Sequence, residues 1–154
     1  MIPLRLSPAG RPERLLANMI DTLALFLLAY VLKSLAGDGG AVLLLDFTVN
    51  LAYYTCFTGS RWQATPGKRL VMIYVVHESG GELSLRDALE RYLAYVLPSL
   101  PLYSSAISEQ LAPMLALWLN IFWFSPILFT PERIGIHDRL CGTRVVAGRP
   151  GSAP

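Results

Sequence analysis

Charged residues are scarce in this sequence. Of its 154 residues, 16% are Asp, Glu, Lys or Arg and 53% are hydrophobic, and the mean hydropathy is +0.45. A soluble domain carries about 25% charged residues, so much of the surface must face something other than water. The net charge of +2 provides no dense basic stripe, and we expect no nucleic-acid partner. The length leaves no room for a large soluble domain beside a membrane bundle.

Cysteine is almost absent, and so are the signatures of catalysis. Only Cys56 and Cys141 occur, and no cluster of cysteine and histidine has metal-ligand spacing. We expect two free thiols and no metal or other cofactor. No nucleophile elbow precedes a helix, and the segment at 66–69 lacks the upstream glycine of a phosphate-binding loop. We therefore expect that the protein is not an enzyme.

Long apolar runs dominate instead. They predict an all-α membrane protein, a bundle of four transmembrane helices with a small cytoplasmic β element, with spans at about 14–36, 41–60, 87–103 and 112–130. Pro98 and Pro101 interrupt the third run, which we predict to be a kinked span; a re-entrant segment is the alternative. The first run exceeds the apolar length of a signal peptide, so we expect it to be retained. We find no internal repeat of the inverted-transporter kind.

The basic residues predict the orientation of the chain. Of the 13 lysines and arginines, all but Lys33 lie before the first run, between the second and third, or after the fourth. The positive-inside rule places these segments in the cytoplasm. We thus expect a cytoplasmic N-terminal segment at 1–13, a membrane domain at 14–147 with a cytoplasmic loop at 61–86, and a disordered tail at 148–154. Both termini are then cytoplasmic.

The loop at 61–86 carries recognisable local signals. Thr65, Pro66 and Gly67 match a type II turn, with proline second and glycine third. Residues 70–76 are largely β-branched or aromatic and predict a strand, which we expect to pair with a second β-branched run at 143–146. Ser84 followed by Asp87 predicts a capped helix start.

Two carboxylates fall inside apolar runs, where ionisable groups are costly. Asp21 follows Arg14 and Asn18 at a spacing that places all three on one helix face, and Asp46 is one turn before Asn50. Such aspartates can form a proton, cation or substrate site, because protonation relieves their desolvation. Alternatively, they can be fasteners that hydrogen-bond to neighbouring helices.

Three further polar residues are candidates. Asn120, midway along the fourth run, either bonds another helix or lines a polar cavity. His137 and Asp138 follow that run; they form either a proton-responsive pair at the cytoplasmic mouth or a capped turn that ties the tail to the bundle. Lys68 and Arg69 more simply anchor the loop to anionic lipid headgroups.

Three segments together resemble one family. They are the run at 14–21 with an arginine first and an aspartate last, the run at 65–70 followed by a strand and a Gly-Gly turn, and the run at 135–143. In order and spacing they resemble the RDD family of small bacterial membrane proteins. The resemblance identifies Arg14, Asp21 and Asp138 with the arginine and the two aspartates that name the family. It implies a bacterial inner membrane location and a role in transport, for which sodium/proton antiport has been proposed in some members.

These inferences converge on a functional expectation. We expect a transport component for a cation or small solute that uses its intramembrane aspartates, with a cation or proton as ligand. Because four helices hardly enclose a pathway alone, we expect the protein to act in the bilayer with further copies of itself or with a membrane partner protein. The alternative is a non-transporting membrane scaffold, assembly or regulatory module.

Overall fold

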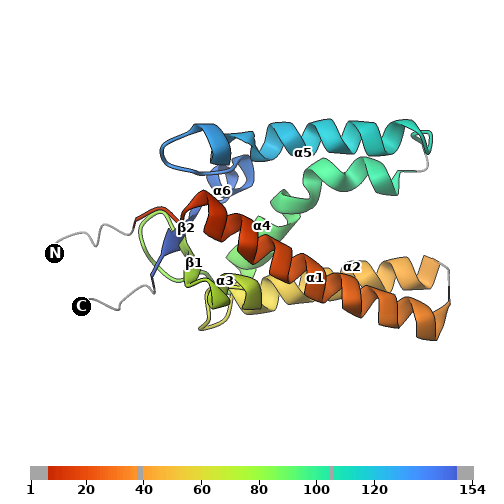
Figure 1. The fold of residues 1–154 in the computed structure, drawn as a ribbon, viewed down its shortest axis with the longest axis horizontal. Helices are drawn as coiled ribbons and strands as arrows, with labels where there is room; N and C mark the ends of the chain where they lie inside the picture. Colours follow the sequence, from red (N-terminus) through yellow and green to blue (C-terminus); the bar gives the residue numbers. More distant parts are fainter. Residues whose placement is uncertain (1–6, 38–39, 105, 149–154) are drawn as a thin grey trace.

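The protein consists of two helical arms that diverge from a small, compact end. The computed structural model describes residues 7–37, 40–104 and 106–148. One arm pairs α1 (Arg11–Ala36) with α2 (Gly40–Thr58), and the other pairs η1 (Leu97–Tyr103) with α5 (Leu111–Phe129) (Figure 1). The compact end holds α3 (Pro66–Leu70), β1 (Ile73–His77), α6 (Ile136–Leu140) and β2 (Thr143–Ala147). We call it the sheet end.

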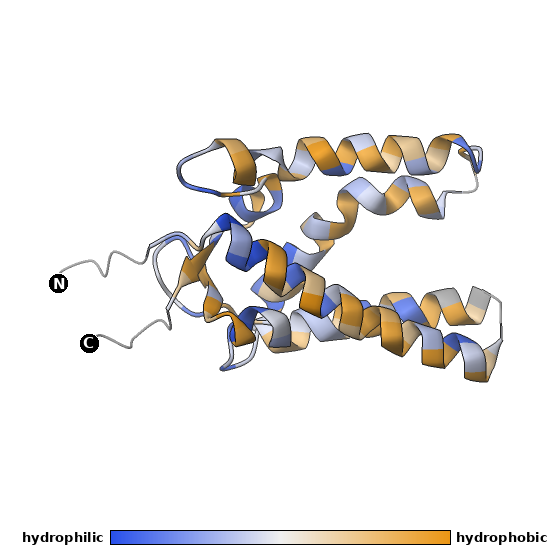
Figure 2. Cartoon of the chain, in the orientation of Figure 1, coloured by the Kyte–Doolittle hydropathy of each residue, from blue (hydrophilic) through white to orange (hydrophobic). Residues whose placement is uncertain are grey.

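The arms are apolar and largely uncovered by protein. Of the described helices, α1 and α5 are long and apolar enough to cross a membrane. In α1 only Ala17, Asp21 and Leu25 are buried, and their spacing of four residues marks a single narrow stripe. Hydrophobic residues cover both arms, while hydrophilic ones gather near the sheet end (Figure 2). The prediction of a mostly helical chain with apolar helices of membrane-spanning length is confirmed for α1 and α5.

The third apolar run begins as a regular helix and then tightens. Ser84 and Asp87 form the predicted capping box at the start of α4 (Leu85–Val96). The chain continues from Val96 directly into η1, a 3₁₀ helix in which Pro98 and Pro101 are buried. Each proline lacks the N–H that a continued α-helix would use. The change of helix type therefore falls at the prolines that predicted a kink.

The predicted strand pairing is confirmed. Strands β1 and β2 pair antiparallel, in a register that runs from Ile73 opposite Ala147 to His77 opposite Thr143. The buried residues of both strands are all β-branched, and they lie on both faces of the sheet: Ile73, Val75, Val76, Thr143, Val145 and Val146. The described chain also begins and ends here, because Ala147 N–H donates to the Ser7 carbonyl.

Two local predictions in the loop were wrong. The strand was predicted to begin at residue 70, but Leu70 is the last residue of helix α3, and the strand begins only at Ile73. Thr65 is not a turn residue either: it caps α3, and its hydroxyl oxygen accepts from Lys68 N–H at 3.5 Å. The proline of a type II turn and the proline of a first helical turn require the same backbone angle. Pro66 therefore did not distinguish the two structures.

The two halves of the chain repeat one backbone pattern. Helix α3 and strand β1 recur as α6 and β2, each 70 residues later. The positive φ angles recur with them: Gln63 (49°) corresponds to Arg133 (53°), and Met72 (56°) to Gly142 (57°). The strand register is symmetric about the pair Val75 and Val145. Each half thus contributes two long helical segments, one short helix and one strand, in the same order along the chain.

One seam breaks this symmetry. The second helix of the first half, α2, packs along α4, where the Tyr54 and Tyr92 rings stack with centroids 5.4 Å apart. The repeat would place α5 against α1 in the same way. Among the described residues, however, α1 and α5 make few contacts. The seam between these two helices is therefore the open one.

The chain termini fall mainly outside the described residues. Positions 1–6 of the predicted cytoplasmic segment and 149–154 of the predicted disordered tail are not described. Gly148, the first residue of that tail, is held at the sheet end because its N–H donates to the Met72 carbonyl at 3.0 Å. Helix α1 begins at Arg11, slightly before the predicted span.

Candidate functional site

Asp21 joins three segments of the chain. Its side chain is buried, and the residue is only 1% exposed. Oδ1 accepts from the Tyr53 hydroxyl of α2 at 2.7 Å and from the Gly67 N–H of α3 at 2.8 Å. Oδ2 accepts from the Thr65 hydroxyl. A carboxylate that accepts three hydrogen bonds avoids the cost of an unpaired buried charge, and this geometry is that of a fastener.

Only glycine fits at position 67. A Cβ atom there would lie 2.4 Å from the Ala17 carbonyl oxygen and 2.7 Å from Asp21 Oδ1. Both distances are far below van der Waals contact. The glycine therefore allows the N-terminus of α3 to lie against α1, and the positive end of that helix faces the carboxylate.

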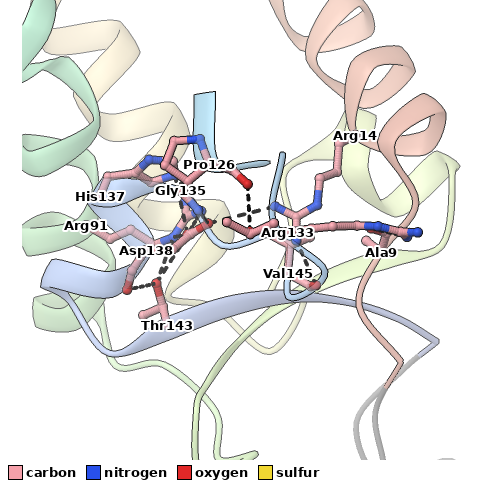
Figure 3. Close-up of polar contacts among 11 residues, drawn as sticks. Ala9, Arg14, Arg91, Pro126, Arg133, Gly135, His137, Asp138, Thr143 and Val145 are labelled. Atoms are coloured by element: carbon pink, nitrogen blue, oxygen red, sulfur yellow. Dashed lines mark hydrogen bonds and ion pairs between the residues drawn. The ribbon is translucent and has the colours of Figure 1, made fainter. Parts of the chain in front are cut away.

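Asp138 is the centre of a second cluster, at the start of α6 (Figure 3). Its Oδ1 pairs with Arg91 Nη2 at 2.5 Å and with Arg91 Nε at 3.1 Å. Its Oδ2 lies 3.8 Å from Arg14 Nη1 and accepts from the Gly135 N–H at 3.3 Å. The last bond caps α6, so one carboxylate connects α1, α4 and α6.

Further contacts tie this cluster to the sheet. Arg14 Nη2 donates to the Val145 carbonyl of β2 at 3.1 Å, and Arg91 Nε lies 3.2 Å from Thr143 Oγ1. Arg133 Nη1 donates to the Ala9 carbonyl at 3.3 Å, just before α1 begins. These bonds also appear in Figure 3. The arginine of the 14–21 segment thus meets Asp138 and not Asp21.

His137 is buried beside the cluster and stays neutral. Burial, with the nearby charge of Arg91 opposing a second cation, lowers its pKa to about 3. Its Nε2 lies 3.3 Å from Arg91 Nη2, and its ring packs on Phe124 and Tyr95 with centroids 5.2 Å and 5.5 Å away. Burial alone would raise the pKa of Asp138, but the surrounding charges, Arg91 foremost, outweigh it and lower that pKa to about 2. The geometry favours the capped, tail-tying turn.

The remaining candidates separate into two places. Asn18 Oδ1 lies 3.5 Å from the Tyr95 hydroxyl, and Asn120 Nδ2 lies 3.3 Å from Ser99 Oγ, so both asparagines bridge helices. Asp46 and Asn50 contact each other at 3.3 Å, as their spacing suggested. That pair lines a separate cavity of 200 Å³ and is not brought to Asp21 or Asp138.

A larger cavity of 470 Å³ lies at the open seam between α1 and α5. Its lining comes from both arms and from the sheet end. The polar and charged side chains are those of Arg11, Arg14, Asn18, Tyr54, Thr58, Lys68, Arg91, Tyr92, Tyr95, Asn120 and His137. The apolar side chains are those of Leu15, Ala88, Phe124, Ile127, Leu128 and Val145. Four of the residues predicted from the sequence therefore share this wall: Arg14, Asn18, Asn120 and His137.

Sequence reasoning missed two central residues of the site. Arg91 was interpreted only as one of the basic residues that indicate membrane topology. In the structure it lies on the buried face of α4 with Ala88 and Tyr92, and the helical period of this segment would have placed it there. Lys68 was read as a lipid anchor, yet its side chain lines the cavity. Burial, followed by repulsion from Arg91, lowers the pKa of Lys68 to about 8.

Comparison with known proteins agrees with the resemblance seen in the sequence. The model of the RDD family matches residues 8–142, which include both aspartate clusters. The uncharacterized protein YxaI of Bacillus subtilis (strain 168) is 31% identical over 104 residues, 68% of this chain and 56% of that protein. The chain therefore spans little more than half the length of this curated relative. No solved structure matches.

Proposed function

This chain belongs to the RDD family, and on that premise we propose that it is a transport component of the membrane that binds a small solute in the cavity between α1 and α5. The cavity carries this proposal. Its volume of 470 Å³ falls within the range of small-molecule sites, about 300–1,000 Å³. Its wall combines apolar surface with several polar groups that could orient a ligand.

The proposal includes a topology. In it, α1, α2, α4 with η1, and α5 are four crossings of a bacterial inner membrane, and the sheet end with both termini is cytoplasmic. The distribution of basic residues supports this, because the described arginines and Lys68 lie toward the sheet end while Lys33 lies in the last turn of α1.

In this proposal the aspartates hold the site together and do not themselves bind the solute. Asp21 already accepts bonds from Tyr53, Gly67 and Thr65. Asp138 is paired with Arg91 and Arg14. Among the described residues no carboxylate lines the cavity. These contacts support binding of a solute more than coupling through a free intramembrane carboxylate.

A non-transporting scaffold or assembly module is the second candidate. One observation favours it: the seam between α1 and α5 is not closed within the chain. A helix of a second copy or of a membrane partner protein could lie there. Transport also requires such an assembly in our proposal. The cavity is open at the side where α1 and α5 make few contacts, so a helix from another chain is needed to enclose it.

Flux measurements on matched variants test the proposal. Leu15 lines the cavity and is 63% exposed, whereas Leu16 does not line it and is 50% exposed. Tryptophan at position 15 should obstruct the cavity, and tryptophan at position 16 should face only lipid. Proteoliposomes would be assayed for uptake of sodium, uptake of inorganic phosphate, and movement of labelled phosphatidylglycerol between leaflets.

We expect flux of at least one of these species, reduced by Leu15→Trp and unchanged by Leu16→Trp. The proposal fails if the protein moves none of the three above the level of empty liposomes. It fails equally if the two tryptophan variants reduce flux to the same extent, because the cavity then has no part in it.

A further inference from the structure

The cavity at the open seam has a basic wall. Four cationic side chains line it: Arg11, Arg14, Lys68 and Arg91. The only carboxylate that forms an ion pair with any of them, among the described residues, is Asp138. Asp138 is shared by Arg14 and Arg91, so the lining carries more positive charge than its protein partners neutralise.

Two of these four cations, Arg11 and Lys68, form no ion pair among the described residues, and Lys68 is the less exposed of the two. Its ammonium lies 5.8 Å from the centroid of the Tyr54 ring. A cation over an aromatic face at this distance gains little compared with an ion pair. Desolvation lowers its pKa to about 8, and the positive charge of Arg91 adds to that effect. Lys68 is half-buried, and an anion beside its partly desolvated ammonium would stabilise the charge.

Arg14 also has a donor that an anion could satisfy. Its Nε is buried and has no hydrogen-bond partner among the described residues, although its two terminal nitrogens reach Val145 and Asp138. A guanidinium presents several donors in one plane and binds phosphate groups well. Asn18, Asn120 and the tyrosines of the lining can supply neutral bonds around such a group.

The cavity wall also continues onto the apolar outer surface of the arms. Leu15 of α1 and Leu128 of α5 both line the cavity, yet they are 63% and 56% exposed. These two helices are the ones long and apolar enough to cross a membrane. A ligand held at the basic wall could therefore extend an apolar portion along the arms into the surrounding lipid.

We propose that the cavity binds a phosphate ester, the anionic headgroup of a phospholipid, with Lys68 and Arg14 as its principal cationic contacts. The acyl chains leave through the seam between α1 and α5. This inference rests on the proposed function and names its ligand class. The binding site requires no covalent step, and the lipid is held by charge, hydrogen bonds and apolar contact alone.

Binding to the full-length protein, delipidated in detergent, tests this inference. Native mass spectrometry would compare phosphatidylglycerol with phosphatidylcholine, and inorganic phosphate would be added as a competitor. We expect phosphatidylglycerol to bind at least tenfold more tightly than phosphatidylcholine. Lys68→Gln should weaken it at least tenfold, because the substitution removes a charge-assisted hydrogen bond to the phosphate. Lys68→Arg should retain most of the binding.

Arg139→Gln is the matched control. Arg139 is exposed, lies at the same end of the molecule and does not line the cavity, so its loss should leave phosphatidylglycerol binding unchanged. Equal binding of the two lipids would overturn the inference, as would equal effects of Lys68→Gln and Arg139→Gln. If millimolar inorganic phosphate displaced phosphatidylglycerol completely, the proposed lipid ligand would be wrong, and the site would instead bind a soluble phosphate ester.

The two proposals fail separately. Binding of phosphatidylglycerol that depends on Lys68, without any flux in proteoliposomes, would refute transport and leave the anion site standing. Flux that Leu15→Trp reduces but Lys68→Gln does not would leave transport standing and refute the anion site. Thermal stability of each variant, measured in the same detergent, identifies any variant that has merely failed to fold.

Discussion

Asp21 and Gly67 are in direct contact: the Gly67 N–H donates to Asp21 Oδ1 at 2.8 Å, and no side chain fits between them. The contact brings the buried carboxylate of α1 to the N-terminus of a short helix 46 residues later in the chain. The contact thus holds α3 against α1. Because Lys68 of α3 lines the cavity, the same contact positions part of the cavity wall.

Gly67→Ala should destabilise the protein. The added Cβ would lie 2.4 Å from the Ala17 carbonyl oxygen, and overpacking of this kind costs about 1–3 kcal/mol. Gly81→Ala is the control, because its nearest neighbour would be Ser79 Oγ at 3.8 Å. Thermal unfolding in detergent should show a lower midpoint for the first variant only. Equal midpoints would mean that α3 does not lie against α1.

The two uncharged replacements of Asp21 should differ from each other. Asp21→Asn keeps an acceptor for the Tyr53 hydroxyl and the Gly67 N–H, so the folded bundle should persist. Asp21→Leu removes the acceptor for all three donors, and each buried unsatisfied group costs about 1–3 kcal/mol. We expect Leu to lower the unfolding midpoint far more than Asn. If Asp21→Asn abolished flux while the protein remained stable, the fastener role would be wrong and Asp21 would be a functional site.

Arg91→Met should be among the most damaging changes. It leaves Arg14, whose Nη1 is 3.8 Å away, as the one arginine still paired with the buried Asp138 carboxylate among the described residues, and breaking a buried ion pair costs about 3–5 kcal/mol. Arg86→Met, which breaks the exposed pair with Glu90, should cost below about 0.5 kcal/mol. Combining Arg91→Met with Asp138→Leu should recover part of the loss. Strictly additive losses in this cycle would show that the two residues are not coupled.

Lys68 should make stability depend on alkaline pH. Its pKa falls from 10.5 to about 8 on folding, so the unfolded chain binds more protons between these values and stability rises with pH there. The gain is at most about 3 kcal/mol, since each tenfold change in proton affinity is worth about 1.4 kcal/mol. The charges that act on Lys68 are those of Arg91, Asp21, Asp138 and Arg14.

Lys68→Gln isolates this contribution. The unfolding midpoints of the wild type and the variant would be measured from pH 7.5 to 10.5. Every other titrating group is present in both proteins, so its effect cancels in the difference between the two midpoints. The difference between them should shift in favour of the wild type as the pH rises. A difference that is constant with pH would show that Lys68 is as solvated in the folded protein as in the unfolded one. Anion binding should weaken over the same range, because the ammonium loses its proton.

Cysteine labelling tests the membrane orientation. In a protein without Cys56 and Cys141, single cysteines would replace Ser79 in the turn after β1 and Ser108 in the connection before α5. An impermeant maleimide should label position 108 in intact cells and position 79 only after permeabilisation. The reverse pattern would place the sheet end outside the cell, and labelling of both positions would show that the chain does not have four crossings.

Local signals in the sequence were sufficient for part of the fold. The pairing of β1 with β2 followed from two β-branched runs at the same end of the bundle, and Ser84 with Asp87 specified the start of α4. Gly67 shows the limit of such signals. Its presence suggests a turn residue with positive φ, but the structure requires it for close approach to a distant carboxylate.

The site was harder to predict than the fold, because its contacts are distant in the sequence. Arg91 and Asp138 are 47 residues apart, and Arg14 reaches Val145 over 131 residues. No periodicity encodes such pairs. The repeat left only a short signal in the sequence. Positions 69 and 139, 70 and 140, 75 and 145, and 76 and 146 carry identical residues, whereas Met72 matches Gly142 and Gln63 matches Arg133 in backbone angle alone.

The repeat has a consequence for how the chain recognises itself. Each half places one buried charge on its first helix, and the signs differ: Asp21 in the first half binds the start of α3, and Arg91 in the second binds Asp138 of α6. The two halves are therefore not interchangeable. Only the first supplies Lys68, which forms no ion pair among the described residues, and only the second supplies the Arg91–Asp138 pair beside it. The chain is comparable to two unlike subunits joined in one polypeptide, and the 470 Å³ cavity lies at the seam where the repeat would otherwise place α5 against α1.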